Sequence, residues 1–282
     1  SYNHARYLGR ALQSILDQTY TNWEAIVIDN HSTDNTDEVM TSFTDPRITY
    51  LKIQNNGVIA ASRNVGIRAA KGEWIAFLDS DDWWTADKLQ FCFAHINDKI
   101  DLVYHDLEIV SDKHKLFSRK IIKSWQVRTP VLIDLLLKGN AIVNSSVVVR
   151  WSLLEQIGGI NESVEMIASE DYNTWLRIAQ LTEQFVYLPR SLGYYLTHTQ
   201  SLSQKDMSVA GRCAVAEFVP ALKVPQKLKL EANFRYTSLR FNYLTVKFSE
   251  IKLDLLFVLR HGNVVKKIKA LMLLMMIIIK RN

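Results

Sequence analysis

Short apolar segments that alternate with segments of helical periodicity constrain the fold of this chain most strongly. Residues 24–29 (EAIVID) and 74–79 (WIAFLD) are two such apolar segments, and residues 47–53 (RITYLKI) are a third. Between them, residues 58–70 carry apolar side chains at the spacing of a helix. This alternation predicts an α/β fold, in which a mostly parallel, Rossmann-like sheet has helices on both of its faces.

Acidic residues lie where two of these apolar segments end. Asp29 ends the first segment, and Asp79, Asp81 and Asp82 follow the apolar residues of WIAFLDSDDWW. Carboxylates so close together repel one another unless a cation or a ligand lies between them. In open α/β sheets, ligands bind at the carboxyl ends of the strands. The sequence therefore predicts a ligand crevice at this edge of the sheet.

The spacing of Asp79 and Asp81 narrows the kind of ligand. The chain has neither a GxGxxG dinucleotide fingerprint nor a GxxxxGK[ST] phosphate loop. Two carboxylates two positions apart can reach one crevice, and their oxygens suit Mg²⁺ or Mn²⁺, which take further ligands from a substrate phosphate. The residues alone leave a second interpretation open, namely an acidic loop in solvent that caps the next helix.

The cysteine content excludes two other classes of protein. Cys92 and Cys213 are the only cysteines among 282 residues, and neither belongs to a CxxC or a His-Cys cluster. This argues against a disulfide framework and a structural zinc site, and it fits a reducing compartment. No signal peptide is visible.

The charge is distributed unevenly along the chain. Residues 1–218 carry a net charge of −5, whereas residues 219–282 carry +10. The contrast predicts a main domain over 1–203 and a helical, basic extension over 204–282. The extension contains ten consecutive apolar residues at 270–279, too few for a spanning helix, which needs roughly 20. Basic residues on both sides favour a helix lying on an anionic membrane surface; packing on the main domain or on a partner chain is the alternative.

Several motifs occur in the order in which glycosyltransferases of family 2 carry them. They are the initial SYN, VIDNHSTDNT (27–36), NNGVIAASRNVGI (55–67), GEWIAFLDSDDWW (72–84), GGINE (158–162), SEDYNTWLRIA (169–179) and YYLTHTQSLS (194–203). Over residues 1–203 the chain thus resembles these inverting, nucleotide-sugar-dependent enzymes. The resemblance implies a GT-A fold and transfer of a sugar from a nucleotide diphosphate to an acceptor hydroxyl.

The resemblance also implies nucleotide-sugar-binding residues. Tyr2 and Asn3 match a loop that touches the nucleoside, and Arg63 matches an arginine on a helix beside the nucleotide. Asp29 matches the first acid of a frequent Asp-Asp pair that holds base and ribose. The second position is Asn30 here, a departure that bears on base preference because an amide donates and accepts, whereas a carboxylate only accepts.

Metal-binding and catalytic residues are implied in the same way. Asp79 and Asp81 match the family's DxD motif, with Asp81 as a ligand of Mn²⁺ or Mg²⁺ and Asp79 facing the ribose or the metal's waters. His198 matches a late histidine that completes the metal or diphosphate site. Glu170 and Asp171 are the implied catalytic residues, with Asp171 matching the catalytic base.

The chemistry of two of these residues has a simpler alternative. Inverting transfer needs a base that takes the proton of the acceptor hydroxyl, and Asp171 opens a helical segment where it could act. An acid in the first turn of a helix can also be a capping residue. His198 stands in a polar segment and can equally be a surface residue.

Taken together, the motifs predict a glycosyltransferase of cell-surface polysaccharide or glycolipid assembly. The expected donor is a UDP-sugar, and the expected acceptor is a saccharide or a lipid-linked saccharide. We expect a cytoplasmic protein, peripheral on the inner face of the membrane through 251–282, and no nucleic-acid binding, because no recognisable binding module is present. A non-catalytic binding or scaffolding protein is the alternative. An Asp-nucleophile phosphohydrolase is disfavoured, because its DxDx[TV] motif would need Thr or Val where Trp83 stands.

The start of the chain departs from the family pattern. Ser-Tyr-Asn follows an apolar first strand in the family, whereas here it opens the sequence. We therefore expect the first strand of the fold to be missing from this sequence, with unpaired ladder groups on the neighbouring strands.

Overall fold

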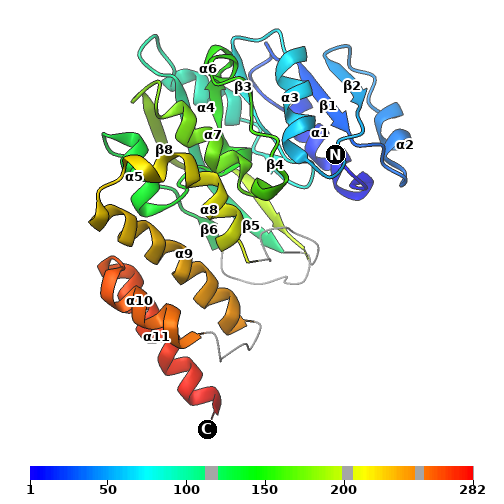
Figure 1. The fold of residues 1–282 in the computed structure, drawn as a ribbon. Coiled ribbons are helices and arrows are strands. Elements are labelled where there is room, and N and C mark those ends of the chain that lie inside the picture. The colour runs from blue at the N-terminus through cyan, green and yellow to red at the C-terminus, as the bar shows by residue number, and fades with distance from the viewer. Residues whose placement is uncertain (112–119, 199–205, 245–250, 282) are drawn as a thin grey trace.

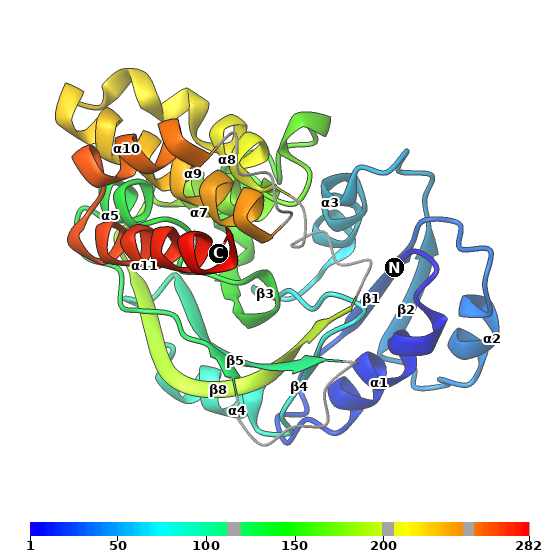
Figure 2. The same cartoon turned by 90° about the horizontal axis from the view of Figure 1, so that it is seen from below.

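The computed structural model describes residues 1–111, 120–198, 206–244 and 251–281. In both views, the N-terminal strands and the C-terminal helices lie at opposite ends of the molecule (Figures 1 and 2). Strands and helices alternate along most of the chain, and among the described residues helices alone follow β8. The predicted α/β class with a helical C-terminal extension is therefore confirmed.

The N-terminal part is a small parallel sheet with helices packed around it. Its elements are α1 (Ala5–Leu16), β1 (Ala25–Asp29), α2 (Thr36–Thr41), β2 (Ile48–Lys52) and α3 (Ile59–Ala69). Strands β1 and β2 pair in parallel, with Ala25 opposite Ile48. The apolar side of α1 packs against α2 through Leu8, Leu12 and Met40, as its helical periodicity predicts.

A second, curled sheet forms the centre of the molecule (Figure 2). Its strands, in spatial order, are β3 (Trp74–Ala76), β7 (Val148–Arg150), β5 (Leu102–Ser111), β8 (Phe185–Thr197) and β4 (Trp83–Trp84), with β6 (Lys120–Ile122) on β5. The helices between these strands are α4 (Lys88–His95), α5 (Val131–Lys138), α6 (Trp151–Gln156) and α7 (Glu170–Ile178).

The direction of the strands differs from the expectation of a mostly parallel sheet. Among the described strands of the central sheet, β5 and β8 pair in parallel, whereas β3–β7, β5–β7, β4–β8 and β5–β6 pair antiparallel. Strand β7 begins with the buried residues Val148 and Val149, and a short apolar segment has the same appearance in sequence whichever way it is paired. The sheet is therefore mixed.

The C-terminal helices pack in two groups. They are α8 (Ser208–Val215), α9 (Val224–Leu244), α10 (Ile251–His261) and α11 (Val264–Arg281). Side chains of α8 and the first half of α9 belong to the main apolar core, whereas the second half of α9 forms a separate core with α10 and α11. The division after residue 203 stays a prediction, and residues 199–205 lie outside the described ranges. Among the described helices, none has the length and apolar character needed to cross a membrane.

A cavity of about 1490 Å³ lies between β1 and β3. Its apolar part is lined by side chains of both strands, and its polar part by the residues that follow them. Ser1 lies alongside the end of β1, where its amine donates to the Ile28 carbonyl and its carbonyl accepts from the Asn30 amide. The polar part of this space lies at the carboxyl ends of β1 and β3, as expected for a ligand crevice.

Candidate active site

The end of β1 organises the loop at one side of the cavity. Asp29 is fully buried and accepts hydrogen bonds from the backbone amide and the hydroxyl of Ser32. Ser32 in turn accepts from the backbone amide of Asn3, whose side-chain oxygen accepts from the Thr33 amide at 2.8 Å. Asp29 and Asn3 therefore hold the two loops together, and neither lines the cavity.

Asn30 and Tyr2 stand beside a second, smaller cavity of about 490 Å³. The side-chain oxygen of Asn30 accepts a 2.8 Å hydrogen bond from the Asn55 amide, which fixes the turn that leads to Gly57. Tyr2 is 55% exposed and lines both cavities. An exposed aromatic ring beside amide donors and acceptors is suited to stacking on a nucleobase.

A buried arginine joins two acidic residues from distant parts of the chain. Arg63, on α3, donates to Asp79 at 2.7 Å and to Glu170, the first residue of α7, at 2.6 Å. Although burial opposes its charge, the carboxylates of Asp79 and Glu170 raise the pKa of Arg63. Asp79 also accepts from the Asn144 side chain at 2.9 Å. Arg63 thereby fixes α3, α7 and the loop after β3 relative to one another.

Asp81, two residues further along this loop, contacts a histidine. Its Oδ2 is 3.0 Å from Nε2 of His198, which follows β8. The His198 ring stacks on Tyr7 with centroids 5.3 Å apart, and its edge contacts His4 at 5.9 Å. His4 itself makes a 2.8 Å hydrogen bond with the Ser80 hydroxyl, and burial lowers its pKa. His198 is thus a buried cavity residue, and the alternative of a surface histidine is wrong.

Asp82 lies behind the pair, away from solvent. It is 1% exposed and accepts a 3.0 Å hydrogen bond from the Leu196 amide of β8. Burial, together with the negative charges of Asp79 and Asp81, raises the pKa of Asp82 well above its usual range. Its hydrogen bond with Leu196 ties the acidic loop to β8.

Asp171 occupies the first turn of α7, on the wall of the same cavity. Burial and then the neighbouring charge of Glu170 raise the pKa of Asp171 to about 7. The Asn140 side chain donates to its Oδ2 at 3.3 Å. A carboxyl group with a pKa near neutrality is suited to accept a proton at the pH of most cells.

The described residues contain no group of three His, Cys, Asp or Glu side chains placed to hold a metal ion. Asp79 is engaged by Arg63 and Asn144, so Asp81 and His198 remain as adjacent oxygen and nitrogen donors on the cavity wall. Two protein ligands fit a divalent cation that takes its other ligands from water and a phosphate. This donor set is compatible with Mg²⁺ or Mn²⁺.

The structure brings most of the residues implied by the motifs together. Those that line the large cavity are Tyr2, Asn30, Arg63, Asp79, Asp81, Glu170, Asp171 and His198. Sequence reasoning missed His4 and Asn144, which line it too. His4 directly follows the SYN motif, and this position could have indicated that it lines the cavity. Nothing in the sequence around Asn144 indicates that Asn144 is a cavity residue.

Comparisons with known proteins agree with this arrangement. The chain is 33% identical over 179 residues to the Escherichia coli protein named UDP-Glc:alpha-D-GlcNAc-diphosphoundecaprenol beta-1,3-glucosyltransferase WfgD, which covers 63% of this chain and 66% of that one. It is 32% identical over 183 residues to the putative colanic acid biosynthesis glycosyl transferase WcaA of E. coli K12, covering 63% of each chain. The matched region thus spans slightly less than two thirds of these relatives' own lengths.

Among solved structures, the S. aureus TarS crystal structure in complex with UDP shares the fold. It matches with a TM-score of 0.58 and 18% identity, over 86% of this chain and 81% of that chain. The chain thus has the fold of the GT-A class of glycosyltransferases. Within that class, the chain belongs to glycosyl transferase family 2, whose family model matches residues 1–148.

Proposed function

We propose that this chain transfers a hexosyl or related sugar from a nucleotide diphosphate to an acceptor hydroxyl, with inversion at the anomeric carbon. The observation that carries the proposal is that one cavity is lined both by the Asp81–His198 pair and by Asp171, whose pKa of about 7 suits a base. Membership of family 2 supports the class of reaction.

In this reaction Asp171 acts as the general base. Its carboxylate takes the proton of the acceptor hydroxyl as the hydroxyl oxygen forms a bond to the anomeric carbon. The bond from that carbon to the diphosphate oxygen breaks on the opposite face, so the configuration inverts and the electron pair leaves with the diphosphate. Glu170 is 4% exposed and paired with Arg63, so we assign it a positioning role rather than contact with the substrate.

Asp81 and His198 are the residues that would hold a divalent cation, Mn²⁺ or Mg²⁺, together with the diphosphate. When bound, such a cation supplies positive charge that stabilises the leaving diphosphate. Asp79 is held by Arg63 and Asn144 in a fixed orientation beside this position. We assign Asp79 to the ribose and the metal's waters, and Tyr2 and Asn30 to the nucleobase.

The donor and acceptor are proposed from the relatives. UDP occupies the TarS structure, and the name of WfgD gives a UDP-sugar donor and a diphosphoundecaprenol-linked acceptor. We therefore propose a UDP-sugar donor and a saccharide or lipid-linked saccharide acceptor, in polysaccharide or glycolipid assembly. A lipid-linked acceptor would bring the protein to the cytoplasmic face of the membrane as a peripheral protein.

Calorimetric titration with UDP, GDP and dTDP, each with Mn²⁺ and then with EDTA, tests this proposal. We expect UDP to bind with Mn²⁺ and to lose at least about tenfold in affinity on chelation, because EDTA removes the cation to which the phosphate oxygens are bound. Asp81→Ala should lower the Mn²⁺-dependent binding and abolish transfer, whereas Asp98→Ala, at an exposed acid that does not line the cavity, should change neither. If no nucleotide binds with Mn²⁺, the proposal fails; if UDP binds without any turnover, the non-catalytic alternative holds.

A further inference from the structure

Helix α11 exposes an apolar face to solvent. Val264, Ile268, Leu271, Met272 and Met275, here called the docking face, are each between 43% and 72% exposed. Val264, Ile268, Leu271 and Met275 are spaced four, three and four residues apart, and Met272 lies four residues after Ile268. All five therefore lie along one side of the helix. The opposite side is buried, since Ala270 and Leu273 belong to the core that α11 shares with α9 and α10. Apolar patches of this kind on a protein surface mark sites of interaction.

Lysines border the docking face on both sides. Lys267 and Lys269 directly precede and follow Ile268. At about 100° per residue, their side chains project to either side of it. Long lysine side chains can extend along an apolar surface and keep their charged ends in water. An apolar stripe with a lysine on each side is complementary to a layer of acyl chains beneath anionic headgroups.

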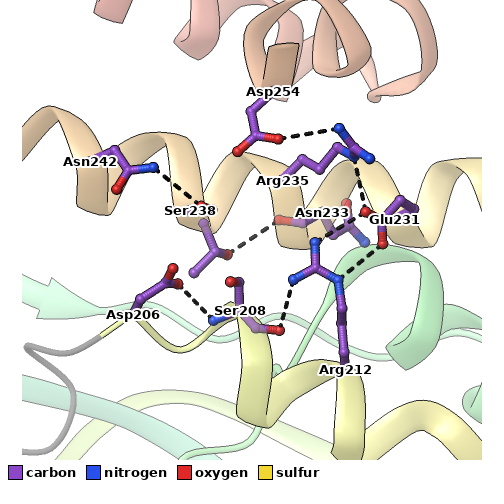
Figure 3. A network of polar contacts seen from close by, with 10 residues as sticks. Asp206, Ser208, Arg212, Glu231, Asn233, Arg235, Ser238, Asn242 and Asp254 are labelled. Atoms are coloured by element: carbon purple, nitrogen blue, oxygen red, sulfur yellow. Dashed lines mark hydrogen bonds and ion pairs between the residues drawn. The ribbon is translucent and has the colours of Figure 1, made fainter. Parts of the chain in front are cut away.

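The acidic residues of this part of the chain do not neutralise those lysines. After residue 219, the described residues include two acids, Glu231 and Asp254. Glu231 pairs with Arg212 at 3.0 Å and with Arg235 at 2.9 Å, and Arg235 also contacts Asp254 at 3.3 Å (Figure 3). Both carboxylates are therefore used between α8, α9 and α10, and the surface of α11 keeps its positive charge.

The docking face is held in a fixed orientation relative to the cavity. Lys266, on the inner side of α11, donates to the side-chain oxygen of Asn233 on α9. Asn233 donates in turn to the Leu137 carbonyl of α5 at 3.0 Å. Helix α5 also accepts a 2.9 Å hydrogen bond from Tyr172, the residue after Asp171. A surface bound to α11 is thus connected through three direct contacts to the helix that carries Asp171.

We propose that the docking face binds the surface of an anionic lipid bilayer, with α11 lying in the plane of the interface and Lys267 and Lys269 on the headgroups. A second copy of the chain fits less well, because a two-fold axis across α11 brings the lysines of the two copies towards one another. The proposal of lipid binding depends only on the residues of the docking face and its lysines. The role of that binding, which is to present a lipid-linked acceptor to Asp171, rests on the proposed function.

Vesicle sedimentation tests the proposal with the full chain. We expect the chain to sediment with vesicles of phosphatidylglycerol and phosphatidylcholine, more weakly with phosphatidylcholine alone, and less as salt rises. The double variant Ile268→Glu with Met272→Glu should lose at least about tenfold in partitioning, because two exposed apolar groups that would enter the bilayer become charged. Lys267→Gln with Lys269→Gln should lower binding to anionic vesicles only. Leu181→Glu, at an apolar residue that is 48% exposed elsewhere, should bind as the parent does.

The outcomes separate this proposal from the proposed function. Equal sedimentation of the parent and the double glutamate variant, or no sedimentation of the parent, overturns the docking face. A parent that is dimeric in light scattering, with a double glutamate variant that is monomeric, also overturns the proposal, because the docking face would then bind a second copy of the chain. Transfer to a water-soluble acceptor should be the same in parent and double variant. If the parent sediments but transfers no sugar, the docking face stands and the proposed function fails.

Discussion

At the scale of single residues, the environment of Asp171 favours its role as a base but lowers the stability of the folded chain. Burial and the charge of Glu170 raise its pKa to about 7, which suits a base but makes the charged form costly in the folded chain. Between about pH 4 and pH 7, the unfolded chain has released this proton and the folded chain still holds it. Stability therefore falls as pH rises through this window. The upper bound of the loss is about 4 kcal/mol, and partial exposure of Asp171 to solvent keeps the loss below that bound.

The substitution Asp171→Asn separates these two properties. We expect kcat to fall by about 100-fold or more, because the amide takes no proton, while UDP binding with Mn²⁺ is unchanged. The kcat/KM of the parent should rise with pH through about 7. In urea, the variant should be more stable than the parent at pH 8 and equal to it near pH 4. Near-normal turnover of the variant would exclude Asp171 as the base, and an equal stability difference at both pH values would exclude the raised pKa.

The sequence predicts the residues of the cavity better than it predicts their contacts. Asp79 and Asp81 were expected in a crevice because they follow a strand, and Asp171 was expected there because it matches the family's catalytic base. All three line the cavity, whereas Asp29, expected at the same edge, does not. The link from Arg63 to Glu170 joins positions 107 residues apart. No periodicity carries such a contact, because it depends on how α3 and α7 pack.

At the scale of elements, strand direction and the contacts between motifs also depend on packing, which the sequence pattern does not show. The apolar runs predicted β1, β2 and β3 to within a few residues, but the antiparallel position of β7 follows from packing between β3 and β5. The Asn of the RNVGI segment and the GGINE segment proved to be one structural unit. The Asn64 side chain exchanges two 2.8 Å hydrogen bonds with the backbone of Ile160 and donates to Glu162, also at 2.8 Å.

Two adjacent glycines in this unit allow a matched comparison. Gly158 and Gly159 both have positive φ, at 72° and 82°. A Cβ at Gly158 would meet nothing within 4 Å, whereas a Cβ at Gly159 would lie 2.7 Å from the Asn64 side-chain oxygen. We expect Gly158→Ala to cost about 1 kcal/mol of stability through backbone strain alone. Gly159→Ala should cost about 1–3 kcal/mol more, because a buried contact must move.

Urea unfolding of the two glycine variants and the parent measures this difference. The background Asn64→Ala provides the control, since it removes the atom that the new Cβ would meet. In that background the two alanine variants should differ by less than about 0.5 kcal/mol. Equal costs of Gly158→Ala and Gly159→Ala in the parent would mean that the loop moves freely and that Asn64 does not clamp it.

At the scale of the whole molecule, apolar packing crosses the division expected after residue 203. Among the residues of α8, α9 and the turn between them, Phe218, Leu222 and Leu230 belong to the same core as the central sheet. Asn173 of α7 donates to the Ala214 carbonyl of α8 at 2.8 Å. The difference in net charge between the two parts of the sequence concerns charged side chains. It carries no information on which helices complete the core, because core membership depends on apolar contacts.

Two shortened chains, ending at residues 205 and 250, locate the end of the folding unit. Without α8 and α9, the core loses Phe218, Leu222 and Leu230, which are 3–5% exposed. Each is worth about 1.5–3 kcal/mol of burial, which together approaches the total stability of about 5–15 kcal/mol of a typical domain. We therefore expect the chain of residues 1–205 to lose cooperative urea unfolding and UDP binding. The chain of residues 1–250 should keep both, because the core that it gives up lies between α9, α10 and α11. A cooperative transition of residues 1–205 at the same urea concentration as the parent would instead support the boundary predicted from charge.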